Sequence, residues 1–461
     1  MSAFNRSISS SRTTSFHRTP NLNRFRRCFH FHFLLIAASL ISLFVAIRDG
    51  YYIYVLPQTH HFSTRNTSLT HCDVYQGRWV PVPPYSLYNA TDCPFVERGF
   101  DCLANGRKDM NYLNWRWKPN DCEIPRLNVS YVLEMFRGKR IVFVGDSMSR
   151  TQWESLVCML MGGVEDKSSV YEVNGKKVSK QIRFLGVRFR DFNFTIEFFR
   201  SVFLVQQGPV PKHAPKRVKS TLRLDRLDDI SDKWVHSDVL IFNTGHWWVP
   251  TKLFDMGCYF QVGRSLKMGM SIPVAFRTAL GTWASWVERK INKSRTRVFF
   301  RTFEPSHWRV SFYTLVAFAQ FKITLTRVPL QAKKKLIDQP RRTCNTTSYP
   351  MIETDGRDQN LFSETVFDVV KNVTVPINLL HVTTMTAFRS DAHVGNWSDN
   401  PSVHDCSHWC LPGVPDMWNE IILSQLSTHY EFPFQQMESQ SEFSYFVMLF
   451  LSLCLAASGM I

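Results

Sequence analysis

The segment RIVFVGDS, residues 140–147, joins an apolar run to a Gly-Asp-Ser turn, and the residues that follow fit a helix. Gly145 permits a tight turn because it has no Cβ. Ser147 is therefore expected at a helix N-terminus, where unpaired backbone N–H groups favour developing negative charge. This is the position of the nucleophile in a strand-turn-helix elbow. The alternative is that Asp146 or Ser147 only caps the helix.

A serine nucleophile needs a base within hydrogen-bond reach and a group that orients the base. Asp405 and His408 are three residues apart in VHDCSHWC, close enough for the carboxylate to hold the imidazole. Spacing alone leaves two alternatives open, a structural histidine and a zinc cluster of Cys406, His408 and Cys410. The Cys-x-His-x-Cys spacing is not usual for zinc and an oxidising compartment favours disulfides, so no metal is expected.

A larger domain, expected over residues 129–430, must position these side chains. Apolar strand-like runs alternate there with longer amphipathic stretches; the runs are RIVFVGDS, TIEFFRSVFLV, SDVLIFNTG, RVFFRTFEP and INLLHVTTM. Such alternation is typical of α/β domains. It predicts an α/β fold with a mostly parallel sheet.

The N-terminus carries a topology signal. The first 48 residues hold seven arginines and no acid. A basic tail over 1–28 precedes an apolar run at 29–47, which is about the length that a bilayer core requires. The positive-inside bias places the tail in the cytosol and the remainder, beginning with a stem at 48–70, in the lumen. A cleaved signal peptide is the alternative, but the preceding chain is long for an n-region.

Lumenal exposure agrees with two further patterns. Nine cysteines lie between the ends of the chain, which fits an oxidising compartment, and because nine is odd at least one thiol has no partner within the chain. Eight Asn-x-Ser/Thr sequons predict a glycoprotein. They are Asn66, Asn89, Asn128, Asn193, Asn292, Asn345, Asn372 and Asn396.

Residues 71–128 form a Cys/Trp-rich N-terminal module with many turn residues and little periodicity. The module contains four cysteines and three tryptophans. We expect it to hold its shape through disulfides and aromatic packing rather than through a core of its own.

The GDS and DxxH motifs, together with the module sequences CDVYQGRWV and YLNWRWKPNDCEIPR, resemble the plant trichome birefringence-like family over residues 71–425. The resemblance implies an SGNH-hydrolase-like (GDSL) three-layer α/β/α sandwich in a Golgi type II membrane protein that O-acetylates cell-wall polysaccharides. It implies Ser147 as the acetyl-accepting nucleophile, His408 as its base and Asp405 as the orienting acid. The acetyl donor, acetyl-CoA or an acetylated intermediate, is then a co-substrate, and no bound cofactor is expected.

Other residues are candidates to bind an oxyanion or the substrate. Asn243 follows an apolar strand and is either a side-chain oxyanion donor or a turn residue, with Gly245 beside it. Arg150, one turn along the expected helix from the serine, is a candidate to bind donor or substrate. Trp247 and Trp409 offer flat faces for sugar rings, and the alternative for both is burial in the core.

A disulfide pairing is suggested by cysteine spacing, although sequence alone does not fix connectivity. The expected pairs are Cys72 with Cys122, Cys93 with Cys158, Cys102 with Cys410 and Cys344 with Cys406, which leaves Cys258 free. Bridges from Cys406 and Cys410 would fix the position of His408, which lies between them.

Two segments depart from the family pattern. Residues 310–342 look like an insertion or a retained intron, and they carry seven basic residues and one acid. They supply over half of the positive charge that remains after the N-terminal arginines are set aside. The net charge of +17 is therefore no argument for an acidic partner, and no nucleic-acid partner is expected. Residues 443–461 form a second hydrophobic stretch, interpreted as a second anchor, a lipid-anchor signal or an artefact.

Three function classes remain. The first is an O-acetyltransferase acting on xylan, mannan, xyloglucan or pectin, with its catalytic domain in the Golgi lumen. The second is an acetylesterase with the same triad, because water and a sugar hydroxyl compete for one acetyl-serine. The third is a non-catalytic binder of pectin or another wall polysaccharide. The sequence indicates no oligomeric state.

Overall fold

A computed structural model describes residues 72–83, 87–309 and 343–427. Several predicted features lie outside the described residues and stay predictions: the tail 1–28, the apolar run 29–47, the stem 48–70, the insertion 310–342, the stretch 443–461 and the sequon at Asn66. The chain divides into two units, Met1–Cys72 and Asp73–Ile461, and the fold below is that of the second. No helix within the described ranges is both long and apolar enough to cross a bilayer.

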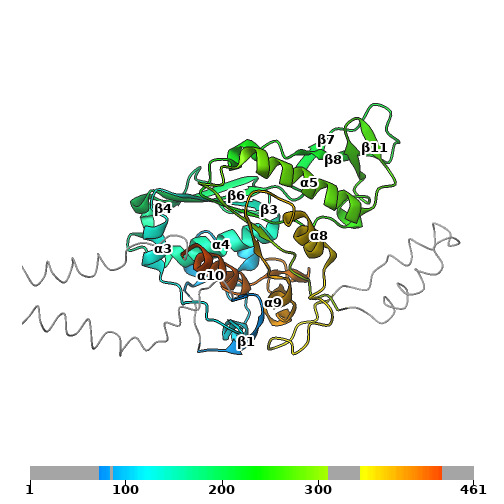
Figure 1. The fold of residues 1–461 in the computed structure, drawn as a ribbon. Helices are drawn as coiled ribbons and strands as arrows, with labels where there is room; N and C mark the ends of the chain where they lie inside the picture. The colour runs from blue at the N-terminus through cyan, green and yellow to red at the C-terminus, as the bar shows by residue number, and fades with distance from the viewer. Residues whose placement is uncertain (1–71, 84–86, 310–342, 428–461) are drawn as a thin grey trace, which may run out of the picture. The chain divides into compact units, whose positions relative to one another are not determined.

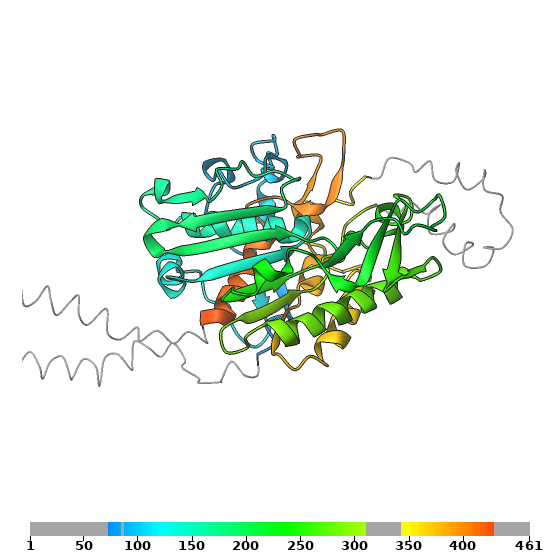
Figure 2. The same ribbon diagram turned by 90° about the horizontal axis from the view of Figure 1, so that it is seen from above.

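Seven strands form the central sheet in the order β13-β12-β9-β3-β6-β5-β4 (Figures 1 and 2). The strands from β13 to β6 run parallel, and β5 and β4 extend the sheet in antiparallel fashion. Each parallel strand comes from one of the five apolar runs, so the predicted α/β fold with a mostly parallel sheet is confirmed. The bounds are β3 Arg140–Gly145, β4 Val170–Glu172, β5 Phe184–Phe189, β6 Phe194–Arg200, β9 Val239–Phe242, β12 Arg297–Arg301 and β13 Ile377–Leu380.

Strand β3 is apolar throughout because both of its faces are covered. Ile141 and Phe143 pack into a hydrophobic cluster on one side of the sheet. Val142 and Val144 pack into a second cluster on the other side. A strand buried on both faces reads as a continuous apolar run rather than as an alternating one.

Helices α3, α4 and α10 cover one face of the sheet, and α5 and α8 cover the other (Figure 1). The second face also carries a four-stranded sheet, β11-β10-β8-β7, which the sequence did not predict. The helices are α3 Val129–Met135, α4 Ser147–Met161, α5 Ile272–Lys290, α8 Leu361–Val370, α9 Thr383–Ala387 and α10 Val414–Ser427. The added strands are β7 Val205–Gly208, β8 Ser220–Leu227, β10 Cys258–Val262 and β11 Ser265–Lys267.

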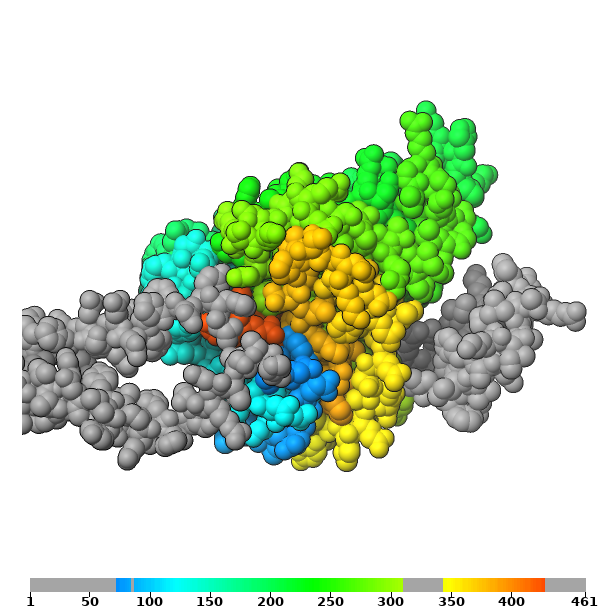
Figure 3. Space-filling view, viewed as in Figure 1, coloured from blue at the N-terminus to red at the C-terminus, as the bar shows by residue number. Residues whose placement is uncertain are grey.

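The N-terminal module packs directly on the C-terminal part of the chain (Figure 3). Its strands β1, Gly77–Pro81, and β2, Trp115–Pro119, form a small antiparallel sheet. Trp79 on β1 donates through Nε1 to the carbonyl oxygen of Met385 at 2.7 Å. Trp117 on β2 is buried in the same hydrophobic cluster as helices α4 and α10. The module thus shares its core with the α/β domain.

Two disulfides link the module to the domain, and a third lies within the domain. The bonds Cys93–Cys158, Cys102–Cys410 and Cys344–Cys406 are present, as expected from the sequence. Cys72 and Cys122 are each disulfide-bonded, and their mutual pairing stays a prediction. Cys258 is a free, buried thiol.

The Cys102–Cys410 bond closes a chain segment of 308 residues, so it should restrict the unfolded chain strongly. We expect the double substitution Cys102→Ser and Cys410→Ser to lower the free energy of unfolding by roughly 2–5 kcal/mol, measured by urea denaturation. Cys258→Ala is the matched control and should cost clearly less, because it breaks no bond. Equal losses in the two variants would contradict the stabilising role of the bond.

Candidate active site

Ser147 is the first residue of α4, directly after the turn at the end of β3. The carboxylate of Asp146 caps the helix by accepting a hydrogen bond from the Met148 N–H at 3.0 Å. Gly145 is required at this turn, since a Cβ there would lie 1.8 Å from Oδ1 of Asn243. Asp146 therefore does the capping, and the Ser147 side chain is left for another role.

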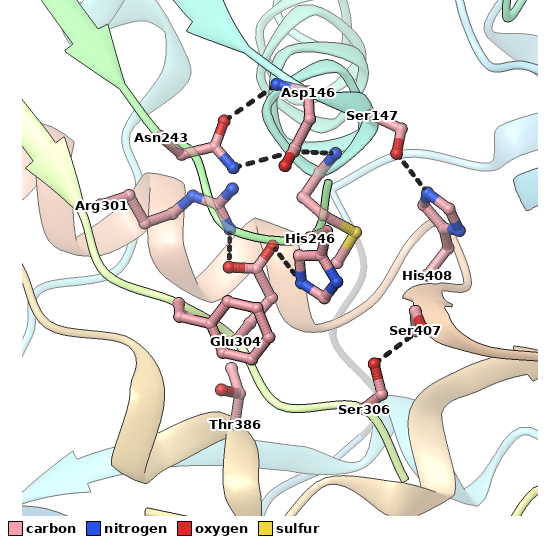
Figure 4. Close-up of polar contacts among 12 residues, drawn as sticks. Asp146, Ser147, Asn243, His246, Arg301, Glu304, Ser306, Thr386, Ser407 and His408 are labelled. Atoms are coloured by element: carbon pink, nitrogen blue, oxygen red, sulfur yellow. Dashed lines mark hydrogen bonds and ion pairs between the residues drawn. The ribbon is translucent and has the colours of Figure 1, made fainter. Parts of the chain in front are cut away.

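Asn243 follows β9 and holds the turn from the neighbouring strand (Figure 4). Its Nδ2 donates to Oδ1 of Asp146 at 2.9 Å, and its Oδ1 accepts from the Asp146 N–H at 3.3 Å. The side chain is buried. These contacts give Asn243 a positioning role, and its expected role as an oxyanion donor stays a prediction.

The other two residues of the expected triad lie on β15, Asp405–Trp409, which pairs with β14, His393–Gly395. His408 Nε2 lies 2.6 Å from Ser147 Oγ (Figure 4), and His408 Nδ1 lies 2.7 Å from Asp405 Oδ2. The second carboxylate oxygen, Oδ1, accepts from the backbone N–H groups of Ser407 and His408. The structure thus joins the three residues in one hydrogen-bonded relay.

The electrostatics of the relay keep Asp405 ionised. Burial alone would raise the pKa of this carboxyl group. The charge of His408 and the hydrogen bonds from its ring and from the backbone outweigh burial, and together they hold the pKa well below its usual range. An ionised Asp405 can keep the proton of His408 on Nδ1, which leaves Nε2 free to accept from Ser147.

The strand that carries His408 is fixed from several directions. Cys406 is bonded to Cys344 and Cys410 to Cys102, so neither sulfur is available for the alternative zinc cluster. The ring of Phe100, from the N-terminal module, stacks on the imidazole of His408 with centroids 5.2 Å apart. Phe100 could not be expected from the sequence, because no local motif connects it to the DxxH segment.

Arg150 does not reach the position expected for a donor- or substrate-binding residue. Its guanidinium is buried, forms an ion pair with Glu97 of the module and donates a hydrogen bond to Glu154 at 2.5 Å. The sequence predicted that Arg150 would be free to bind donor or substrate, but Glu97 of the module occupies its guanidinium. Arg150 ties the module to α4 and positions the helix that begins at Ser147.

The tryptophans separate into core and surface residues. Trp409 is fully buried and stacks on His393 with ring centroids 3.9 Å apart, so the expectation that it binds sugar rings is wrong. Trp248 is also buried. Trp247 is half-buried and lies close to two cations, Arg200 and Lys252.

A second group of charged residues, which the sequence did not predict, lies close to the turn (Figure 4). Gly245 approaches Phe303 so closely that a Cβ would lie 2.6 Å from the ring, and the next residue, His246, stacks on that ring at 4.4 Å. His246 Nε2 lies 3.5 Å from Glu304, which in turn pairs with the fully buried Arg301 at 3.1 Å. All come from segments at the carboxyl ends of β9 and β12.

The charges of this group reinforce one another. Burial lowers the pKa of His246, but the hydrogen bond and the charge of Glu304 together raise it by more. The net shift is therefore upward. Burial raises the pKa of Glu304, whereas Arg301 and His246 lower it more, and the net shift is downward. The group therefore pairs a histidine whose pKa is raised with a glutamate whose pKa is lowered. A local signal exists only for His246, in the segment NTGHWW.

Seven of the eight predicted glycosylation sites lie among the described residues. Six are exposed and Asn345 is half-buried. The exposed ones are Asn89, Asn128, Asn193, Asn292, Asn372 and Asn396. All seven stay predictions.

Comparison with known proteins places this geometry in a family. Residues 70–123 match the PMR5 N terminal Domain, and residues 124–314 and 318–425 match the GDSL/SGNH-like Acyl-Esterase family found in Pmr5 and Cas1p. The chain is 56% identical over 415 residues to protein trichome birefringence-like 7 of Arabidopsis thaliana, covering 88% of this chain and 86% of that protein.

The chain belongs to the trichome birefringence-like family. It is also 40% identical over 374 residues to protein trichome birefringence-like 9 of Arabidopsis thaliana, covering 79% of this chain and 86% of the relative. The trichome birefringence-like chain thus carries an acyl-esterase type of domain, and the family expected from the motifs is confirmed.

Two carboxyl groups buried around α4 make stability depend on pH. Burial raises the pKa of Asp416 to about 7 and that of Glu154 to about 8. A carboxyl group with a raised pKa binds its proton more tightly in the folded state, so its stabilising contribution is lost as pH rises toward that pKa. His246, with its raised pKa, has the same sign. Burial lowers the pKa values of His307 and His393, so these two groups make stability rise with pH, but only below about pH 6.5.

We therefore expect the free energy of unfolding to fall by roughly 1–3 kcal/mol between about pH 6.5 and pH 8. Urea denaturation at both pH values measures the change. In the Asp416→Asn variant the change should be smaller, because one of the titrating groups has been removed. A free energy that rises over this interval would contradict the buried-carboxyl account.

Proposed function

We propose that this protein is an O-acetyltransferase that acetylates hydroxyl groups of plant cell-wall polysaccharides through an acetyl-serine intermediate on Ser147. The observation that carries the proposal is the relay from Ser147 Oγ through His408 to Asp405, with contacts of 2.6 Å and 2.7 Å. These are hydrogen-bond distances for a nucleophile, its base and the acid that orients the base. The family match to acyl-esterases supports ester chemistry at this serine.

In the first half-reaction Ser147 Oγ attacks the carbonyl carbon of the acetyl donor while His408 Nε2 takes the hydroxyl proton. The proton then passes to the leaving group, and the acetyl ester of Ser147 remains. The oxyanion forms at the N-terminus of α4, where the Ser147 N–H and the helix dipole favour negative charge. The donor is acetyl-CoA or an acetylated intermediate.

In the second half-reaction a sugar hydroxyl gives its proton to His408 Nε2 and attacks the acetyl ester. Ser147 leaves with that proton, which restores the free enzyme. Asp405 stabilises the imidazolium in both half-reactions, because its carboxylate is ionised and held by two backbone N–H groups. The acceptor is xylan, mannan, xyloglucan or pectin.

An acetylesterase is the second candidate, and the description of the matched family as acyl-esterases favours it. The same acetyl-serine is hydrolysed when water, rather than a sugar hydroxyl, reaches it. The two activities differ in how well the site positions the acceptor and excludes water. A non-catalytic wall-polysaccharide binder is the remaining possibility.

The location that fits this function is the Golgi membrane, with the α/β domain in the lumen. The disulfides indicate an oxidising compartment of the secretory pathway. Six predicted glycosylation sites are exposed, as a lumenal glycoprotein requires. In this proposal residues 29–47 form the single membrane anchor.

Incubating the full-length protein with a labelled acetyl donor and separate deacetylated glycans distinguishes the three classes. Acetylated polymer indicates the transferase. Release of free acetate without polymer acetylation indicates the esterase. Neither product from a folded, glycan-binding protein indicates the non-catalytic binder and overturns the proposal.

The triad predicts a graded set of losses. Ser147→Ala and His408→Ala should each lower kcat/KM for acetyl transfer by roughly 10³-fold or more, because the nucleophile and base act as a unit. Asp405→Asn should lose less, since this residue acts through the histidine. Ser285→Ala on the exposed side of α5 is the matched serine control and should retain full activity. Undiminished transfer by a folded Ser147→Ala protein would rule out the triad.

A further inference from the structure

Arg200 lies beside the nucleophile turn, at the carboxyl end of β6. In the parallel pairing of β3 with β6, Arg200 stands opposite Gly145, and the next residue, Ser201, donates its N–H to the Gly145 carbonyl oxygen at 2.8 Å. Neighbouring strands are about 4.8 Å apart. The backbone of Arg200 is therefore one strand spacing from the residue that precedes the Asp146-Ser147 turn.

The guanidinium of Arg200 is half-buried, yet no carboxylate among the described residues pairs with it. The Cζ atom of Arg200 lies over the ring of Trp247, 5.1 Å from the ring centroid. Asp146 is the acid that attracts it electrostatically, but no ion pair or hydrogen bond joins the two side chains, and Oδ1 of that carboxylate accepts from Met148 and Asn243. Burial, followed by the charge of Arg150, lowers the pKa of Arg200. Among the described residues, Asp146 attracts the Arg200 charge, but no carboxylate forms a direct ion pair with it.

Lys252 brings a second positive charge to the same ring. It is exposed, and its Nζ lies 4.9 Å from the centroid of Trp247. The two charged groups are therefore within about 10 Å of each other. Like charges repel, and an anion that binds to either of them weakens the repulsion.

We propose that Arg200, Trp247 and Lys252 form a binding site for an anionic group of the substrate beside Ser147. The guanidinium plane, supported by the Trp247 ring, suits a carboxylate or phosphate held by two hydrogen bonds, and Lys252 adds an adjustable point charge. Two sources supply this chemistry: the carboxylate of a uronic acid in the acceptor, and a phosphate of an acyl-CoA donor. The inference rests on the proposed acetyl transfer, since it names the chemical class of a substrate for that site.

Trp247 has a different role here from the sugar-stacking one expected of it. Cations lie close to its ring, so it supports the charges that bind the ligand. Trp247 lies near the nucleophile turn because it is four residues after Asn243, whose side chain is hydrogen-bonded to Asp146. The site is thereby linked on both sides to Ser147, through β6 and through the segment after β9.

Equilibrium binding to the full-length Ser147→Ala protein tests this site without turnover. The probes are CoA, trigalacturonic acid and, as the uncharged comparison, xylotriose. We expect at least one of the anions to bind, with an affinity that falls as salt is raised. Adding Arg200→Gln should weaken that binding by about 10-fold or more, whereas Arg200→Lys should retain part of it. Lys252→Gln should have a smaller effect because this side chain is exposed.

Arg217→Gln is the matched control. Arg217 is also an arginine over an aromatic ring, 5.6 Å from the centroid of Tyr259, but that ring belongs to the second sheet. The control removes the same charge and the same kind of contact, so affinity should stay unchanged. Thermal unfolding of each variant confirms that the protein remains folded.

Each outcome decides the inference. Loss of CoA binding alone in the Arg200→Gln variant identifies the donor phosphates as the ligand, and loss of trigalacturonate binding alone identifies the acceptor carboxylate. Loss of both supports a site for either anion. Binding of neither anion, or equal effects of Arg200→Gln and Arg217→Gln, overturns the inference. Because the measurement needs no acetyl transfer, failure of this site and failure of the proposed function are seen separately.

Discussion

The hydrogen bond between Ser147 Oγ and His408 Nε2 joins residues 261 positions apart, and the surrounding structure holds its two ends in place. One end depends on the turn after β3, where Asp146 caps α4 and Asn243 holds Asp146 from β9. The other end depends on β15, which is a short strand outside the central sheet. Ser147 on α4 and His408 on β15 can stay 2.6 Å apart only if both elements pack on the same hydrophobic core.

The N-terminal module supplies much of that fixation. Its Phe100 stacks on His408, its Cys102 is bonded to Cys410, and its Glu97 pairs with Arg150 on the helix that starts at Ser147. The module therefore touches both ends of the Ser147–His408 contact. This explains in physical terms why a disulfide-rich segment with no core of its own accompanies the α/β domain: it clamps the two elements that carry the relay.

The sequence was sufficient where the signal is local. Five apolar runs predicted the five parallel strands, and the GDS and DxxH spacings predicted which residues the structure brings together. It failed where the answer depends on distant contacts: Arg150 was placed in the site because nothing in its own helix shows that Glu97 covers it. The error at Trp409 was avoidable, since residues adjacent in a strand point to opposite faces and His408 faces Ser147. The second sheet was missed because polar residues interrupt its longest strand, STLRLDRL of β8, and because β7 and β11 have only four and three residues.

The central claim, that Ser147 carries the acetyl group, is tested most directly by mass spectrometry of the protein itself. The full-length enzyme is incubated with an acetyl donor in the absence of glycan, and its peptides are mapped before and after a deacetylated glycan is added. The account predicts one acetyl group on the peptide that contains Ser147, its disappearance when the acceptor is added, and its absence from the Ser147→Ala variant. Acetyl transfer to the glycan with no acetyl group ever present on Ser147 would contradict the account.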